Sequence, residues 1–252
     1  MCRMFFQCST EPFTLEFDFL KKFIASCRFH YFRKYNIYGR HRLGWGFAYM
    51  PENDNKTLIV KRDIAPIYHS DWKNLANIKT KFLLVHARKT KPWRKDIKNV
   101  HPINIHEKFL IAHNGVINTF PSKKLNDPVL EDIQTSTDLD TRKYLCHIID
   151  NLNTSFNLKN ALESVFREIT IGSSANAFLF NSQQCHVITY HRNDYKGRHH
   201  TLFIEKKKNR FNVCTTPILE KSKEIDNNSL ISINLNNLEL RFSKLAVQVP
   251  NE

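Results

Sequence analysis

The stretch that decides the fold is residues 108–115, which read KFLIAHNG. A continuous apolar run of this length, closed by polar residues, is typical of a central strand that is buried on both faces. A second run of the same kind, FLLVHAR, occupies residues 82–88. We therefore predict two central buried strands whose ends each present polar side chains.

Upstream of these runs, strands and helices alternate. Apolar residues at three- and four-residue spacing predict a helix over residues 14–35, because that spacing places them on one helix face. The turn-forming PENDN at residues 51–55 predicts a hairpin between the strands on either side of it. The other elements expected here are a strand over residues 3–7, the hairpin strands over 44–50 and 57–61, and a short helix over 70–78.

Downstream, two helices are followed only by strands. Helices are predicted over residues 138–152 and 158–169, with Thr137 and Asp140 as a capping pair for the first. The strands expected after them are residues 175–180, 186–190, 201–204, 211–215, 230–235 and 238–242. This order predicts an α+β fold whose sheets carry the helices on their outer faces. Without a repeat, a low-complexity block or a linker, residues 1–252 are expected to form a single domain.

The composition is that of a globular chain with a large core. Of the 252 residues, 41% are hydrophobic, which excludes a disordered or collagen-like protein. Only six are Gly, which disfavours a Gly-rich dinucleotide-binding fold. No apolar run approaches the roughly 18 residues that a membrane span needs, and the N-terminus lacks the apolar region of a signal peptide. We expect a cytoplasmic protein that does not engage a membrane.

The formal net charge of +14 supports a different class of function. Such a charge attracts nucleic acid, anionic surfaces or acidic substrates over long range. Basic and aromatic residues are interleaved over residues 28–42, and a second basic cluster spans 206–210, so a basic nucleic-acid-binding protein without enzymatic activity is one alternative. No recognised nucleic-acid module surrounds either cluster, and a Lys-rich solvated surface is the preferred interpretation.

The six cysteines are scattered and include no C-x-x-C pair, so neither a zinc module nor a disulfide framework is indicated. Cys2 stands apart because removal of Met1 would leave a thiol and a free α-amino group on one residue. An α-amino group has an ordinary pKa of about 7.7–8.0, so near neutral pH it can accept the thiol proton directly or through one water. Taken alone, Cys2 is also explained as an accidental second residue.

Polar side chains at the ends of the two central strands form the other candidate site. Arg88 is either simply solvated or able to hold a substrate carboxylate through two parallel hydrogen bonds. Asn114 and Gly115 are either a hairpin turn or two donors that converge on a developing oxyanion. Asp138, in the TDLD of residues 137–140, belongs either to a helix cap or to a site for a substrate ammonium.

In combination, the order and spacing of these motifs resemble the class II glutamine amidotransferases, a family of N-terminal-nucleophile (Ntn) hydrolases. The similarity is greatest to the stand-alone branch, whose members begin MCR and carry DGWG, HxRK, NxHP and AHNG. The counterparts here are MCR at residues 1–3, LGWG at 43–46, HARK at 86–89, NVHP at 99–102 and AHNG at 112–115. The resemblance is strong to about residue 145 and vague beyond it.

The resemblance implies a four-layer αββα sandwich of two antiparallel sheets, with the active site at one end. It also implies that Cys2 is the nucleophile, with its own amine as the base, and that Asn114 and Gly115 form the oxyanion hole. Arg88 would hold the α-carboxylate of a glutamyl group, and Asp138 would hold its α-ammonium. The other substrate-binding residues expected from the matching motifs are His86 and Trp45.

The chain departs from the family pattern at three places. Leu43 replaces the acid of DGWG, and Asp140 replaces a longer Glu. The segment after Arg88 is unusually basic, so Thr90 is given no role. The basic residues between the Arg and His101 are predicted to flank the site and to favour an anionic leaving portion; they are Lys89, Lys91, Arg94, Lys95 and Lys98.

The predicted activity is hydrolysis of the γ-amide of glutamine or of a γ-glutamyl compound through a thioester on Cys2. No metal or organic cofactor is expected. Full amidotransferases pass ammonia to a synthase domain, whereas residue 252 ends this chain at about the size of the glutaminase part. We therefore expect a free-standing γ-glutamyl hydrolase, with a glutaminase subunit that delivers ammonia to a separate synthase as the alternative.

Overall fold

Two antiparallel sheets form the centre of the computed structural model, which describes residues 2–28, 39–52, 57–90, 95–106, 108–181, 183–193 and 199–247. The first sheet runs in the order β11 (Lys223–Ile225), β9 (Leu202–Lys207), β10 (Arg210–Cys214), β1 (Arg3–Phe13), β4 (Thr80–Ala87), β2 (Trp45–Pro51) and β3 (Ile59–Asp63). The second runs in the order β13 (Leu240–Lys244), β12 (Ser229–Asn234), β8 (Gln184–Thr189), β7 (Thr170–Phe180), β6 (Phe109–Thr119) and β5 (Ile103–Ile105).

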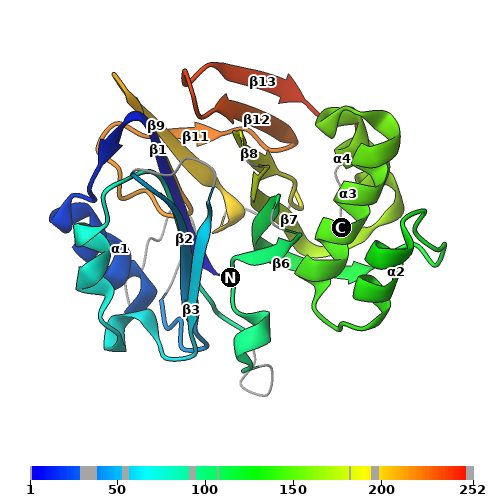
Figure 1. Cartoon of the computed structure of the whole chain (residues 1–252), viewed down its shortest axis with the longest axis horizontal. Helices are drawn as coiled ribbons and strands as arrows, with labels where there is room; N and C mark the ends of the chain where they lie inside the picture. Colours follow the sequence, from blue (N-terminus) through cyan, green and yellow to red (C-terminus); the bar gives the residue numbers. More distant parts are fainter. Residues whose placement is uncertain are drawn as a thin grey trace.

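The helices cover the outer faces of the two sheets (Figure 1). Helix α1 (Phe17–Arg28) and the 3-10 turns η2 (Ile67–His69) and η3 (Trp72–Asn77) pack on the first sheet. Helices α2 (Pro128–Thr135), α3 (Asp140–Ser155) and α4 (Leu158–Glu168) lie on the side of the second. The predicted four-layer αββα sandwich is therefore confirmed. No helix among the described residues is long and apolar enough to cross a membrane.

Strand alternation decides which layer each apolar side chain joins. In β1, Phe6 faces the second sheet and meets Phe178 edge to face, with ring centroids 5.0 Å apart. Its neighbour Phe5 points the opposite way, onto Phe23 of α1, at 4.7 Å. Because both faces of β1 are covered in this way, the strand is buried from its first residues, where the candidate nucleophile lies.

One of the two alternatives left open for Asn114 and Gly115, the hairpin turn, is absent, and one local prediction is wrong. The strand that contains Asn114 and Gly115 does not turn there but continues as β6 to Thr119, with an irregular register after Gly115. The capping pair is also absent, because α3 begins after Leu139 with no side-chain cap and the Asp140 carboxylate instead accepts the backbone N–H of Ile117 in β6, at 3.1 Å. Asp140 therefore ties the start of α3 to the irregular part of β6.

The remaining elements follow the sequence pattern with shifted ends. Helix α1 ends at Arg28, and the rest of the longer helix predicted there falls on residues 29–38, which lie outside the described residues. Five of the described elements were not predicted: α2, β5 and β11, with eight, three and three residues respectively, and the 3-10 turns η2 and η5 (Ile97–Asn99). The turn η5 precedes β5 and borders the candidate site.

Candidate active site

Cys2 lies just before β1, between the end of β4 and the middle of β6. Its backbone N–H donates to Asn114 Oδ1 at 2.9 Å, a contact between residues 112 positions apart. The Sγ atom accepts the backbone N–H of Lys89 at 3.4 Å and lies 3.7 Å from the Lys89 carbonyl oxygen. The half-buried thiol is therefore held by the Lys89 peptide just after β4, and the Cys2 nitrogen by a side chain of β6.

The strand register explains why Cys2 and Arg88 are neighbours. In the antiparallel pair β1–β4, Arg3 is opposite Ala87 and Met4 is opposite His86, so continuing by one residue sets Cys2 opposite Arg88. The pairing is antiparallel, and the start of one strand therefore meets the end of the other.

The backbone of Arg88 is fixed by the Gly-Trp-Gly segment. Its N–H donates to the Gly44 carbonyl at 2.9 Å, and its carbonyl accepts the N–H of Leu43 at 3.4 Å. Gly44 has φ +96°, and an added Cβ would lie 2.8 Å from the Asp63 carbonyl oxygen, so both conformation and space require glycine. Leu43, which replaces the acid of the family motif, contributes through its backbone.

Asn114 offers a donor that the fold leaves available. Its Oδ1 faces the Cys2 N–H, which needs an acceptor, and this fixes the orientation of the amide. The Nδ2 atom is then buried and has no hydrogen-bond partner among the described residues. A buried donor left in this state costs about 1–3 kcal/mol, so its retention is typical of a functional position.

Gly115 is required by the close approach of β7. A Cβ built on Gly115 would lie 1.8 Å from the carbonyl oxygen of Ser174, which no relaxation of a side chain can relieve. The Ser174 hydroxyl donates to the Asn114 carbonyl oxygen at 2.5 Å. Because Ser174 Oγ donates there, it accepts from His200 Nδ1, 2.9 Å away. The backbone around Asn114 is therefore braced from β7.

Three buried histidines lie beneath these residues, and burial disfavours the charged form of each. Burial lowers the pKa of His86 to about 3, and it lowers the pKa of both His101 and His113 below the usual range. The rings of His86 and His101 are 4.4 Å apart. His86 Nε2 donates to the His113 carbonyl oxygen at 3.3 Å. A charged histidine in this layer would face other histidines and would lose its solvation.

The hydrogen bonds of His113 fix the direction of the whole chain of donors. Its Nε2 lies 3.1 Å from the Ser174 carbonyl oxygen and must donate, so in the neutral ring Nδ1 is an acceptor. Thr141 Oγ1, 3.0 Å away, therefore donates to Nδ1 and accepts from His101 Nε2 at 2.8 Å. Thr141 belongs to the first turn of α3, so this hydroxyl joins the helix to β6 and to the segment before β5.

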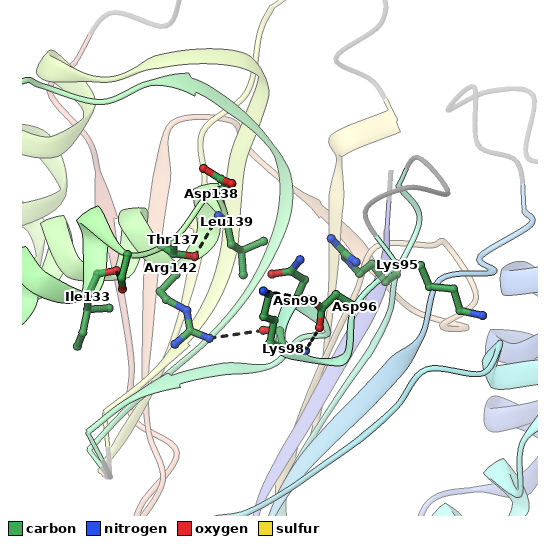
Figure 2. Close-up of a pocket in the computed structure, with 11 residues that line it drawn as sticks. Lys95, Asp96, Lys98, Asn99, Ile133, Thr137, Asp138, Leu139 and Arg142 are labelled. Carbon is green, nitrogen blue, oxygen red and sulfur yellow. Dashed lines mark hydrogen bonds and ion pairs between the residues drawn. The ribbon is translucent and has the colours of Figure 1, made fainter.

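A cavity of about 860 Å³ opens beside this arrangement. Arg88, which is 4% exposed, lines it, and the thiol of Cys2 touches the peptide that follows Arg88. Figure 2 shows Asp138 and Arg142 on one side of the cavity and Lys95, Asp96, Lys98 and Asn99 on the other. Asp138 is exposed, and its carboxylate has no hydrogen-bond or ion-pair partner within the described ranges.

Of the predicted site residues, the structure brings Cys2, Arg88, Asn114 and Gly115 together, and it places Asp138 on the same cavity as Arg88. Two others lie elsewhere. Trp45 is 6% exposed, packs on the α1 side of the first sheet and donates from Nε1 to Ser70 Oγ at 3.0 Å. His86 is fully buried between the sheets, beneath the site rather than on the cavity.

Three contributors were not predicted: Arg142 on the cavity wall, Thr141 and Ser174. Arg142 follows Asp138 by four residues, a spacing that could have suggested a shared side. A lone Thr or Ser carries no such signal, because its role depends on which strand or helix it meets.

The structure describes only part of the two basic clusters that were considered for nucleic-acid binding. The first falls largely on residues 29–38, outside the described residues. In the second, Lys207 pairs with Glu16 at 3.3 Å, and Arg210 lies over the Phe13 ring at 4.6 Å. Part of this second cluster is therefore engaged within the protein.

Several solved structures have a fold similar to that of this chain. The glutamine phosphoribosylpyrophosphate amidotransferase of B. subtilis aligns with a TM-score of 0.63 and 14% identity over 98% of this chain, which spans half of that enzyme. A glutamine aminotransferase class-II domain protein from Silicibacter pomeroyi gives 0.60 and 14%, covering 98% of this chain and all of its own. A predicted glutamine amidotransferase from Pseudomonas aeruginosa gives 0.55 and 13%, covering 95% and 99%.

These identities establish the fold alone, and no curated protein sequence matches this chain. The family is established by a separate match. The model of the glutamine amidotransferases class II matches residues 10–201. Since that match covers most of the sequence, the chain belongs to the class II glutamine amidotransferases.

Proposed function

We propose that this protein hydrolyses the γ-carboxamide of glutamine or of a γ-glutamyl compound, with Cys2 as the nucleophile. The observation that carries the proposal is the contact between Cys2 and Asn114. It joins the start of β1 to β6 at 2.9 Å and leaves a buried amide donor, Asn114 Nδ2, beside the thiol residue. Nucleophile and oxyanion donor are the two groups that acyl transfer requires.

Removal of Met1 would turn the Cys2 nitrogen into a free amine. The amine takes the thiol proton, and the thiolate attacks the γ-carbonyl carbon to form a tetrahedral oxyanion. The N–H groups of Asn114 Nδ2 and Gly115 stabilise this oxyanion. The amine then returns the proton to the leaving nitrogen, the C–N bond breaks, and a γ-glutamyl thioester remains on Cys2. Water, deprotonated by the same amine, releases glutamate and restores the thiol.

The glutamyl end is recognised by opposite charges on the cavity. Arg88 holds the α-carboxylate, since its buried guanidinium presents paired donors that match a carboxylate. Asp138, on the same cavity, holds the α-ammonium. A simple amide lacks both charges and would bind poorly, so the site selects glutamyl substrates over other carboxamides.

Mass spectrometry and kinetics test the nucleophile. Intact mass should show that Met1 is absent, and Cys2→Ala should lower kcat for glutamate release by about 10⁴-fold or more, as expected for loss of a nucleophile. Cys146→Ala, at a buried cysteine of α3, is the matched control and should retain activity. Full activity of Cys2→Ala, or an active protein that retains Met1, would contradict the proposal.

A second variant tests the oxyanion donor. Asn114→Asp keeps an oxygen for the Cys2 nitrogen but removes the Nδ2 donor, so kcat should fall by about 10²–10³-fold. In the wild type, acid quenching during turnover should trap a γ-glutamyl adduct on Cys2. An Asp variant with wild-type kcat would show that Asn114 does not stabilise the oxyanion.

The alternative role is that of a glutaminase that supplies ammonia to a synthase. It is supported by the B. subtilis amidotransferase, of which this chain spans half. One measurement separates the two roles. A free-standing hydrolase releases glutamate without a partner protein, whereas a glutaminase subunit does so appreciably only when its synthase is present.

A further inference from the structure

A second cavity lies over the face of the first sheet that carries α1. It measures about 170 Å³, and a row of three polar side chains on neighbouring strands lines it. Gln7 of β1 is opposite Asn212 of β10, and Asn212 is opposite Glu205 of β9. Gln7 follows Phe5 by two residues and therefore faces the same way, toward α1. It is five residues beyond Cys2, which at about 3.4 Å per residue separates this cavity from the proposed nucleophile by roughly 17 Å.

The three side chains of this row are buried and present oxygen atoms that lack donors. Gln7 and Asn212 are each 3% exposed, and Glu205 is 4% exposed. Gln7 Oε1 and Asn212 Oδ1 have no hydrogen-bond partner among the described residues. The Asn212 amide is oriented by its Nδ2 atom, which donates to Glu205 Oε2 at 2.8 Å. Because a buried acceptor without a donor is costly, two of them on one cavity indicate a ligand that supplies donors.

Within the described part of the chain, Glu205 is a buried carboxylate with no cation in close contact. Its Oε1 atom accepts the backbone N–H of Lys221 at 3.1 Å. The ion pairs of the described residues give it one partner, Lys207, whose Nζ lies 3.9 Å from Oε2. That lysine side chain is 47% exposed and lies closer to Glu16, at 3.3 Å. Since a carboxylate loses its solvation on burial, one with so distant a partner is suited to a cationic ligand.

The rest of the cavity lining combines acidic side chains with apolar ones. Four carboxylates and two lysines line the cavity, although the chain as a whole carries a net charge of +14. A local excess of carboxylates attracts cations and repels anions. The carboxylates are Glu16, Asp18, Glu205 and Glu220, the lysines are Lys22 and Lys207, and the apolar side chains are Phe19, Ile218 and Leu219.

The number of acceptors selects the kind of cation. A primary ammonium group has three N–H donors, and the row offers three acceptors: Gln7 Oε1, Asn212 Oδ1 and the Glu205 carboxylate. A hard metal ion such as Ca²⁺ takes about six to eight oxygen ligands, more than this row provides. At a water's share of liquid volume, about 30 Å³, for each atom, the cavity accommodates about five or six non-hydrogen atoms.

We propose that this cavity binds a small primary alkylammonium ion. The nitrogen donates to Gln7, Asn212 and Glu205, and the alkyl chain packs on the apolar side of the cavity, formed in part by Phe19 and Leu219. Binding is non-covalent and does not depend on the proposed hydrolase activity, because the two cavities share no lining residue.

Calorimetric titration with n-butylammonium chloride tests this site. The ion has five non-hydrogen atoms, and we expect a dissociation constant of about 1 mM, within what a ligand of this size can reach. Two probes separate the charge from the donors: 1-butanol keeps the chain but has no charge, and tetramethylammonium keeps the charge but has no N–H group. Both should bind at least about 10-fold more weakly, because each lacks charge-assisted hydrogen bonds.

Two variants place the bound ion in the cavity. Gln7→Met removes one acceptor and should weaken n-butylammonium binding about 10-fold. It should not lower the melting temperature of the protein without ligand, because the atom it removes is buried and unpaired. Glu205→Gln removes the charge and should weaken binding by at least as much. Glu163→Gln is the matched control, since Glu163 is a buried carboxylate of α4 that already pairs with Lys159 at 3.1 Å.

Three results would overturn the assignment. The first is the absence of n-butylammonium binding at concentrations well above the expected dissociation constant. The second is unchanged affinity in both Gln7→Met and Glu205→Gln, which would place the ion elsewhere. The third is binding of Ca²⁺, added as its chloride, in place of n-butylammonium. Glutaminase activity is measured on the same samples, and an inactive protein that binds n-butylammonium as expected would overturn the proposed function alone.

Discussion

Two walls of the candidate site differ in how they are held. The strand wall consists of Cys2, Arg88, Asn114 and Gly115, which backbone pairing and buried hydrogen bonds place. The charged wall consists of Lys95, Asp96, Lys98, Asp138 and Arg142, which reach the cavity from partly or fully exposed positions. The first can hold reacting atoms to within tenths of an ångström, whereas the second acts through screened charge. The proposed reacting groups therefore lie on the strand wall alone, whereas the proposed recognition of the glutamyl group combines Arg88 of the strand wall with Asp138 of the charged wall.

The largest expected effect comes from breaking the strand wall at Gly115. Gly115→Ala forces a Cβ onto the Ser174 carbonyl, so β6 and β7 must separate. We expect a loss of about 3 kcal/mol or more in the free energy of unfolding, measured by urea denaturation, together with loss of glutaminase activity.

Gly172→Ala provides the control for that experiment. Its added Cβ would meet the end of the Asn118 side chain at 2.5 Å, and that side chain can rotate away. We expect Gly172→Ala to lower the free energy of unfolding by less than about 1 kcal/mol. Equal costs for the two variants would show that the close approach of β7 at Gly115 is not special.

The second effect is a pH dependence that originates under the strand wall. An unfolded histidine protonates near pH 6.5, whereas His86 in the fold remains neutral to about pH 3. The unfolded state therefore binds more protons between these values, and the contribution to stability, complete above about pH 6.5, is lost as the pH falls toward 3. Each such histidine adds up to about 1.4 kcal/mol per pH unit to the slope.

Urea denaturation near neutral pH and about two units lower measures this slope. Burial also lowers the pKa of His101 and His113, so the three should act in the same direction. His86→Gln removes one titrating group and should flatten the dependence. A free energy of unfolding that does not change over this range would mean that the histidines are solvated or paired with acids.

The smallest effect concerns Thr141, which links the start of α3, beside the charged wall, to two histidines beneath the strand wall. Thr141→Val keeps the shape of the side chain but leaves His101 Nε2 and His113 Nδ1 without their shared hydroxyl. This should cost about 1–3 kcal/mol in the free energy of unfolding. Thr141→Ser retains the hydroxyl and should recover most of that loss. If Val proves as stable as Ser, the deduced chain of donors is incorrect.

The sequence predicts the strand wall much better than the charged wall. Apolar runs followed by polar residues placed β4 and the first part of β6 correctly, because burial on both faces leaves few alternatives, although β6 continues to Thr119. The order of motifs indicated the family, and the layered fold followed from it. The roles of Cys2, Arg88, Asn114 and Asp138 stay predictions until the variants are measured.

What the sequence could not predict depends on contacts between distant segments. Asn-Gly is an ordinary turn signal, and only the neighbouring β7 shows why the chain remains extended through Gly115. Asp140 looked like a helix cap but bonds to Ile117 of β6. Trp45 matches a motif of the site, yet its ring faces α1, because alternation along β2 turns it away from the second sheet.

The position of β1 has a consequence for how the protein is made. Its two neighbours are β4 and β10, and Phe5 pairs with Cys214, so the strand that leaves the ribosome early must wait for a partner translated much later. During that interval the peptide bond before Cys2 is open to an aminopeptidase, whereas in the finished sheet Cys2 is half-buried and its nitrogen is bonded to Asn114 Oδ1. For the proposed Cys2 nucleophile, removal of Met1 during synthesis is therefore favoured, and a delay in it is expected to leave folded molecules without activity.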